Sequence, residues 1–216
     1  MESNAREKTV GIERNTKPYL LKRLISDGFD TVLILGLFLL FTALILNGPL
    51  AKTYRVHFER YKAMEAEAIA AYGDDAQAIT DALNGSAEYR DERFAASLHS
   101  YLLKALAGLL ATAPVLLVVP LVNKYRATPG KLMTGIVPFH ERRQRSAVWY
   151  QILYRFLFVF LIDGLLLYLY TGIWTFVLVP VLRLIEILLS RKDKTICDMI
   201  TGVMIIEKLS YNGIQS

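Results

Sequence analysis

Long runs of apolar residues constrain this 216-residue chain more than any other feature of its sequence. A helix needs about 20 mostly apolar residues to cross the hydrocarbon core of a bilayer. Two runs have that length, 24–46 and 101–122, and a third extends over 147–189. Hydrophobic residues make up 54% of the chain, against roughly 45–50% in soluble domains. The sequence therefore predicts an all-α integral membrane protein.

The third run is too long for a single crossing. Its roughly 43 residues would form a helix of about 64 Å, about twice the thickness of the hydrocarbon core. Gly172 permits a tight turn, so we place two spans at 147–169 and 173–189. Three aromatic residues then fall at one membrane interface, where amphipathic rings are enriched: Tyr168, Tyr170 and Trp174. With 24–46 and 101–122, these spans predict a four-helix transmembrane bundle.

A secretory signal peptide is the alternative interpretation of the first run. It is disfavoured because Asp27 and Asp30 lie inside the run and no clear A-x-A-like cleavage site follows it.

The distribution of basic residues predicts the orientation of the spans. Lys and Arg gather before the first span, between the second and third, and after the fourth. The segment 47–100 differs, with six basic residues against nine acidic ones. Because cytoplasmic loops of membrane proteins are enriched in Lys and Arg, we expect both termini in the cytoplasm and 47–100 outside. The net charge of +5 then reflects topology, and we expect no nucleic-acid partner.

The segment between the first two spans is expected to form a helical hairpin outside the bundle. Asp74 with Gln77 resembles a helix N-cap and its N3 partner, and Asn84-Gly85 resembles a helix end. Two interpretations stay open: a solvated cap over the bundle, or a docking surface for a protein partner at 53–98. His57 and His99 lie near its two ends and could approach each other, but no further ligand spacing indicates a metal site.

Two short segments with β-branched character are expected to pair as a cytoplasmic β-ribbon. They are 132–139, which follows the turn Thr128-Pro129-Gly130-Lys131, and 201–207. Gly130-Lys131 does not belong to a phosphate-binding loop, since that pattern requires glycine at 125 and Ser or Thr at 132.

Ionisable residues inside the spans are the candidate functional residues, because charge in a bilayer is costly. They form an intramembrane charge network: Asp27, Arg155, Asp163, Arg183 and Glu186. Arg23, Asp27 and Asp30 share one helix face, whereas Asp163 has no obvious partner at its depth. The network is either a fixed set of ion pairs that sets helix register, or an ion or proton relay.

The order of several motifs resembles the RDD family of membrane proteins, which is named for one arginine and two aspartates. Arg23 precedes Asp30, the turn T-P-G-K carries Gly130 and Lys131 before Gly135, and Asp198 lies in I-C-D-M-I-T-G. The resemblance covers 17–46 and 101–208, and Cys197 stands where the family has His. It implies a multi-span bundle in a prokaryotic inner membrane and no single activity, although sodium/proton antiport is associated with some members.

Two functions follow as hypotheses. The first is ion or small-solute transport or coupling, which we expect to need a homo-oligomer because four helices are few for alternating access. The second is a non-catalytic adaptor that docks a partner through the insert. An enzyme is not expected, since the sequence offers no catalytic constellation, and no cofactor or metal is predicted.

Overall fold

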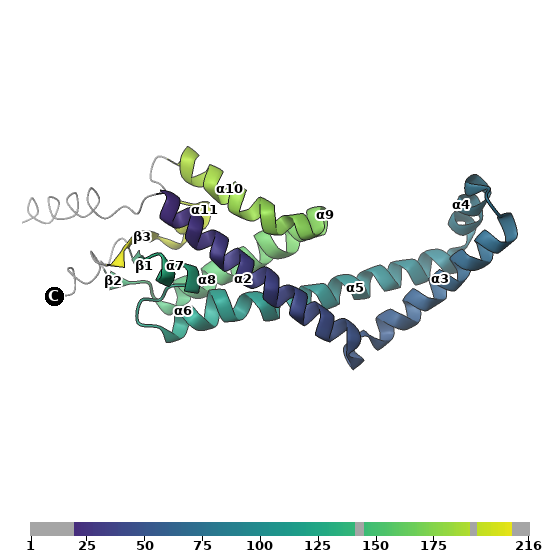
Figure 1. Cartoon of the computed structure of the whole chain (residues 1–216), viewed down its shortest axis with the longest axis horizontal. Coiled ribbons are helices and arrows are strands. Elements are labelled where there is room, and N and C mark those ends of the chain that lie inside the picture. Colours follow the sequence, from purple (N-terminus) through teal and green to yellow (C-terminus); the bar gives the residue numbers. More distant parts are fainter. Residues whose placement is uncertain (1–19, 141–144, 191–193, 209–216) are drawn as a thin grey trace, which may run out of the picture. The chain divides into compact units, whose positions relative to one another are not determined.

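A computed structural model describes residues 20–140, 145–190 and 194–208 (Figure 1). The termini, which the sequence predicts to be cytoplasmic, lie outside these residues. The chain divides into two compact units. We call Met1–Phe38 with Leu109–Ser216 the core unit, and Leu39–Gly108 the insert unit.

Three helical stretches of the described chain are long and apolar enough to cross a membrane. The first is α2 (Leu20–Asn47). The second runs over Ala87–Val122 and comprises α5 (Ala87–Ala113), a π-helical turn and α6 (Val119–Val122). The third is Trp149–Leu189. The membrane class predicted from the sequence is supported, but the four-helix bundle is not confirmed, because the last two predicted spans form one stretch.

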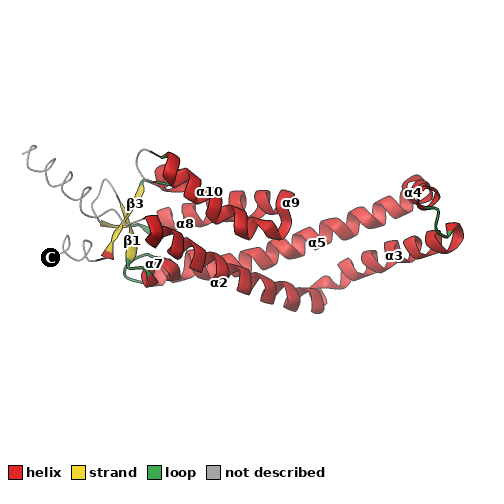
Figure 2. Ribbon diagram, turned by 45° about the horizontal axis from the view of Figure 1, so that its top comes forward, coloured by secondary structure: helices red, strands yellow, loops and turns green. Residues whose placement is uncertain are grey.

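The third stretch reverses its direction at Gly172. It comprises α8 (Trp149–Phe158), a π-helical segment over 159–166, α9 (Leu167–Thr171), a short 3₁₀ turn and α10 (Thr175–Leu189). Gly172 has a φ of +58°, which glycine adopts readily and which ends α9. Phe38 of α2 packs on Tyr168 before the turn and on Phe176 after it. After the reversal α10 runs back beside α8 (Figure 2). The expected break is therefore found at the expected residue.

A small antiparallel sheet closes one end of the core unit. Its strands lie in the order β2 (Arg145–Ser146), β1 (Ile136–His140) and β3 (Val203–Glu207). The predicted ribbon is confirmed in its pairing, with Ile136 opposite Glu207, but β2 adds a third strand. The first part of 132–139 is not a strand, because Leu132 and Met133 belong to the short helix α7 (Pro129–Met133).

Most of the largest fully buried side chains among the described residues lie on the sheet. Val137, Phe139 and Ile206 are buried with Ala127 against one side of the sheet. The short helix α11 (Ile196–Thr201) leads into β3 through Gly202, whose φ is +63°. Gly135, one of the predicted motif residues, enters β1 in the same way with a φ of +69°. Both glycines allow a helix to turn directly into a strand.

The insert unit is helical, as predicted, and built on α3 (Lys52–Tyr72), α4 (Ala76–Gly85) and the first part of α5. Helices α3 and α5 are antiparallel, since His57 stacks on His99 while Glu65 bonds to Tyr89 further along α3. The predicted N-cap is wrong by one residue. Asp75, not Asp74, accepts the backbone N–H of Ala78 and caps α4.

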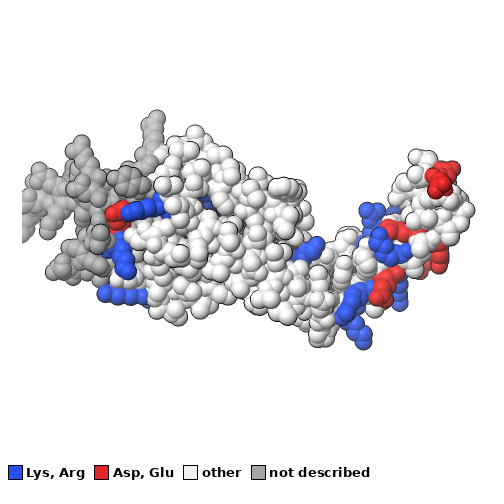
Figure 3. Space-filling model, in the orientation of Figure 1, with Lys and Arg blue, Asp and Glu red and all other residues white. Residues whose placement is uncertain are grey.

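Charged side chains are distributed differently over the two units. The face of the core unit in Figure 3 is almost free of charge over its helices, and charged residues gather near the sheet. The face of the insert unit carries basic and acidic residues side by side over α3 and α5. Large apolar side chains are exposed on the core unit, including Val32, Leu169 and Leu188. This pattern is typical of helices whose surroundings are lipid.

Candidate functional site

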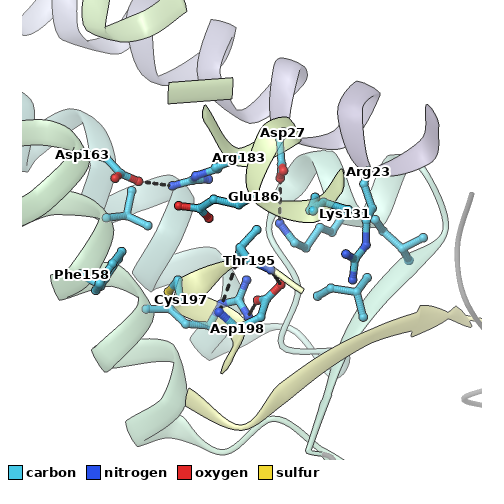
Figure 4. A pocket seen from close by; sticks show the side chains of 15 residues that line it. Arg23, Asp27, Lys131, Phe158, Asp163, Arg183, Glu186, Thr195, Cys197 and Asp198 are labelled. Carbon is cyan, nitrogen blue, oxygen red and sulfur yellow. Dashed lines mark hydrogen bonds and ion pairs between the residues drawn. The ribbon is translucent and has the colours of Figure 1, made fainter. Parts of the chain in front are cut away.

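A small cavity inside the core unit collects most of the charged residues predicted from the sequence (Figure 4). Its volume is about 50 Å³, and one water needs roughly 10–15 Å³ on this measure, so several waters fit. Ile136, Phe158 and Ile187 contribute apolar walls. Its ionisable lining comprises four basic and four acidic side chains, apart from Cys197: Arg23, Lys131, Arg155, Arg183, Asp27, Asp163, Glu186 and Asp198.

Five elements contribute these side chains. Helix α2 supplies Arg23 and Asp27, four residues apart and therefore on one face. Helix α10 supplies Arg183 and Glu186 in the same way, three residues apart. The remaining residues come from α7, from α8 with its π-helical continuation, and from α11: Lys131, Arg155, Asp163 and Asp198. All five members of the predicted intramembrane charge network thus meet at one cavity.

Most of the acids around the cavity are paired with a base. Arg155 forms an ion pair with Asp198, and Lys131 Nζ lies 3.3 Å from Asp27 Oδ1. Asp163, for which the sequence shows no obvious partner, accepts a hydrogen bond of 2.7 Å from Arg183 Nη2. Sequence spacing does not indicate this pair, because the reversal at Gly172 brings the two residues together. In a straight helix they would lie about 30 Å apart.

Glu186 differs from the other acids of the cavity. Its Oε2 accepts the backbone N–H of Ile196 at 3.2 Å. Within the described residues, no basic side chain forms an ion pair with Glu186. It is therefore the lining carboxylate that the basic side chains of the described chain leave outside the ion pairs.

Asp198 is the most tightly held acid of the cavity. It caps α11 together with Thr195, whose side chain accepts the Asp198 N–H at 3.1 Å while Asp198 Oδ2 accepts the Thr195 N–H. Burial by itself raises the pKa of Asp198. The positive charges of Arg155, Arg23 and Lys131 outweigh that effect and hold the pKa below its ordinary value. Asp198 therefore stays ionised at neutral pH.

Asp30 does not line the cavity, although the sequence makes it a leading candidate. Its carboxylate accepts hydrogen bonds from Gly130 N at 2.7 Å and from Thr128 Oγ1, and Lys131 Nζ lies 4.0 Å away. A Cβ atom at Gly130 would lie 2.2 Å from the backbone oxygen of Ser26, so only glycine fits there. The predicted turn residues Gly130 and Lys131 thus form a clamp with Asp30 that fixes α7 against α2.

Sequence reasoning missed Thr128, Thr195 and the place of Cys197. The signal for Thr195 is visible, because a threonine three residues before an aspartate is a capping-box pattern. Thr128 precedes a proline and a glycine, which indicates a turn but not its partner on α2. Cys197 lines the cavity, and burial raises the pKa of its thiol, which therefore stays protonated.

The lining suits water, protons and small ions. None of the chain's three histidines lies in it, and the described residues contain no group of three or more His, Cys, Asp or Glu that could hold a metal ion. No protein-family model, curated protein or solved structure matches the chain. The resemblance to the RDD family therefore rests on the motif residues alone and stays a prediction.

Proposed function

We propose that this chain is a multi-pass membrane protein of RDD type that moves or couples a small ion, such as a proton or an alkali cation, through the charged cavity. The observation that carries the proposal is the convergence of eight ionisable side chains on a water-sized cavity inside an apolar helical unit. Charge enclosed among membrane helices is costly to maintain and is concentrated at ion pathways and proton relays.

The proposal includes a topology with four crossings in a cell (inner) membrane. The reversal at Gly172 would place α8–α9 and α10 as two arms that cross in opposite directions. Both termini and the sheet would then be cytoplasmic, and the insert unit would lie on the outer side. A single chain provides few helices for a complete pathway, so we expect the transporting form to be a homo-oligomer.

Glu186 is the residue that we expect to carry the exchangeable proton or bind the cation. The other acids of the cavity are held in ion pairs by Lys131, Arg155 and Arg183. These pairs hold Asp27, Asp198 and Asp163 in place. Among the described residues, the side chain of Glu186 has only the backbone donor of Ile196, so binding of a proton or cation there would disturb the fewest contacts.

Ion flux into proteoliposomes that enclose a pH-sensitive dye tests this proposal. We expect a sodium or potassium gradient to drive proton movement in the wild-type protein, and Glu186→Gln to reduce the rate at least about tenfold. That loss equals about 1.4 kcal/mol of barrier. Glu67→Gln, a matched change on the exposed surface of α3, should leave the rate unchanged. Absence of flux with the folded wild-type protein, or equal flux in Glu186→Gln, contradicts the proposal.

Asp30→Asn, the variant that the sequence alone suggests, is a poor test of transport. Asp30 holds Gly130 and Thr128 in place and does not line the cavity. Its replacement would loosen the clamp between α2 and α7, so lost flux would not distinguish a missing ion site from a displaced helix.

An adaptor role is the second candidate, and a surface feature of α5 favours it. Phe94, Leu98 and Leu102 follow each other at intervals of four residues and are all exposed, Phe94 by 70%. They form an apolar stripe on a helix whose first half is rich in charged residues. We expect Phe94→Ser with Leu98→Ser, or deletion of 53–98, to abolish co-purification of a partner while the core unit stays folded. An unchanged partner profile in both variants removes this candidate.

A further inference from the structure

Two histidines from different helices lie together in the insert unit. His57 on α3 and His99 on α5 stack with ring centroids 5.4 Å apart and an interplanar angle of 28°. Neither residue belongs to the charged cavity, and the proposed transport function does not use them. What the pair can bind depends on which nitrogen of each ring carries the proton.

The hydrogen bonds of both rings point to the same tautomer. His99 Nδ1 lies 2.8 Å from the backbone oxygen of Ala95. A carbonyl oxygen only accepts, so this nitrogen carries the hydrogen. His57 Nδ1 lies 2.5 Å from Glu92 Oε2, and an ionised carboxylate likewise only accepts. In the neutral form of each ring, Nε2 is then left with its lone pair.

Glu92 is held in position to orient His57. Its second oxygen, Oε1, accepts a hydrogen bond of 3.0 Å from Arg60 Nη1, one helical turn from His57 on α3. A carboxylate that holds the Nδ1–H of a histidine is the usual outer partner of a metal-binding imidazole, because it fixes the ring and increases the basicity of Nε2. Among the described residues, Arg60 is the other charged group that binds this carboxylate. Its side chain is largely exposed, so solvent screens its charge.

We propose that His57 and His99 form a binding site for a divalent first-row transition-metal ion, such as Zn²⁺, Ni²⁺ or Cu²⁺, through their Nε2 atoms. Imidazole suits these ions, whereas Mg²⁺ and Ca²⁺ prefer oxygen ligands. The protein supplies two ligands and water completes the coordination. A metal–nitrogen bond of about 2.0–2.1 Å requires the two Nε2 atoms of the metal-bound form to lie within about 4.2 Å of each other.

Calorimetric titration of the untagged full-length protein in detergent tests the site, with Zn²⁺, Ni²⁺, Cu²⁺ and Mg²⁺ as probes. We expect one transition-metal ion per chain and no binding of Mg²⁺. His57→Gln and His99→Gln should each weaken the affinity at least about tenfold. His140→Gln is the matched control, because it changes the remaining histidine of the chain, which lies on β1, and should leave the affinity unchanged.

Glu92→Gln separates a metal site from a merely structural stack. It keeps both imidazoles but removes the carboxylate, and should lower the affinity by about 10–100-fold. The electron paramagnetic resonance spectrum of the Cu²⁺-loaded wild-type protein should show two coordinating imidazole nitrogens, a readout that needs no variant to fold. Absence of transition-metal binding, undiminished binding in either His57→Gln or His99→Gln, or a spectrum without two imidazole nitrogens overturns the proposal.

Discussion

Two ion pairs with nearly the same geometry lie in very different surroundings. Arg183 and Asp163 in the core unit are 2.7 Å apart, and Lys62 and Glu65 in the insert unit are 2.6 Å apart. The first pair lines a cavity among apolar helices, whereas half of the Lys62 side chain is exposed. An exposed ion pair contributes little to stability, since water solvates both partners when they separate. A charge that loses its partner inside an apolar unit is not solvated in this way, so breaking a buried pair is costly. The distance between the charged atoms therefore does not by itself indicate how much each pair contributes to stability.

The largest expected effect comes from breaking the ion pair of Asp198, the most buried acid among the described residues of the core unit. Asp198→Asn leaves Arg155 without its carboxylate and should destabilise the protein by about 3–5 kcal/mol. The melting temperature in detergent should then fall by roughly 10 °C, at about 2–4 °C per kcal/mol for a chain of this size. Lys62→Met, which breaks the exposed pair, should leave the melting temperature unchanged within error. A similar fall in both variants would mean that the two environments do not differ as described.

A medium effect is expected at the clamp between α2 and α7. Gly130→Ala places a Cβ atom 2.2 Å from the backbone oxygen of Ser26 and should destabilise the protein by about 1–3 kcal/mol. Gly36→Ala is the matched control on α2, because a Cβ atom there meets nothing within 4 Å. Thermal unfolding followed by circular dichroism compares the two. Equal melting temperatures for the two variants would show that α7 shifts freely, and the clamp would then be wrong.

The smallest expected effect is a difference between the two units in how the stability contributed by their carboxylates depends on pH. The pKa of Asp198 lies below its ordinary value of 3.8, so the unfolded chain binds the proton first as the pH falls. The stabilisation by Asp198 is fully present when the pH is above its ordinary pKa of 3.8. It is lost as the pH falls through the lower pKa of the folded state. The Lys62 hydrogen bond also lowers the pKa of Glu65 from 4.5, but in exposed surroundings.

Melting temperatures measured between pH 7 and pH 3 check this contrast. The melting temperature of the wild-type protein should stay constant down to about pH 5 and fall below about pH 4. Asp198→Asn should flatten the acid side of this profile, whereas Glu65→Gln should leave it almost unchanged. A profile that flattens equally in both variants would place the acid-sensitive group outside the core unit.

The sequence predicted those features of the fold that depend on local signals. The apolar runs, the break at Gly172 and the pairing of β1 with β3 follow from run length, a glycine and β-branched residues. The shared face of Arg23 and Asp27 follows from helical spacing. Each of these signals lies within a few turns of chain, where residue type and periodicity decide the outcome.

Features that depend on distant partners could not be predicted in this way. The pairing of Asp163 with Arg183 needs the reversal of the chain, and the role of Asp30 needs a turn 100 residues away. The sequence does not indicate that α5 continues from Ala87 into the span predicted at 101–122, because this helix passes from a polar segment into an apolar one. Hydropathy reports where apolar residues begin, which is not where a helix begins.

The clamp at Asp30 also has a consequence for the order in which the protein folds during synthesis. Its main-chain donor belongs to Gly130, so α2 emerges from the ribosome long before that donor exists. Chains assemble from the N-terminus at about 5–20 residues per second, which leaves Asp30 without Gly130 for roughly 5–20 seconds. During this interval the carboxylate of Asp30 must be hydrated, protonated or bound to a chaperone. Its final hydrogen bonds form only after residues 128–131 have been synthesised.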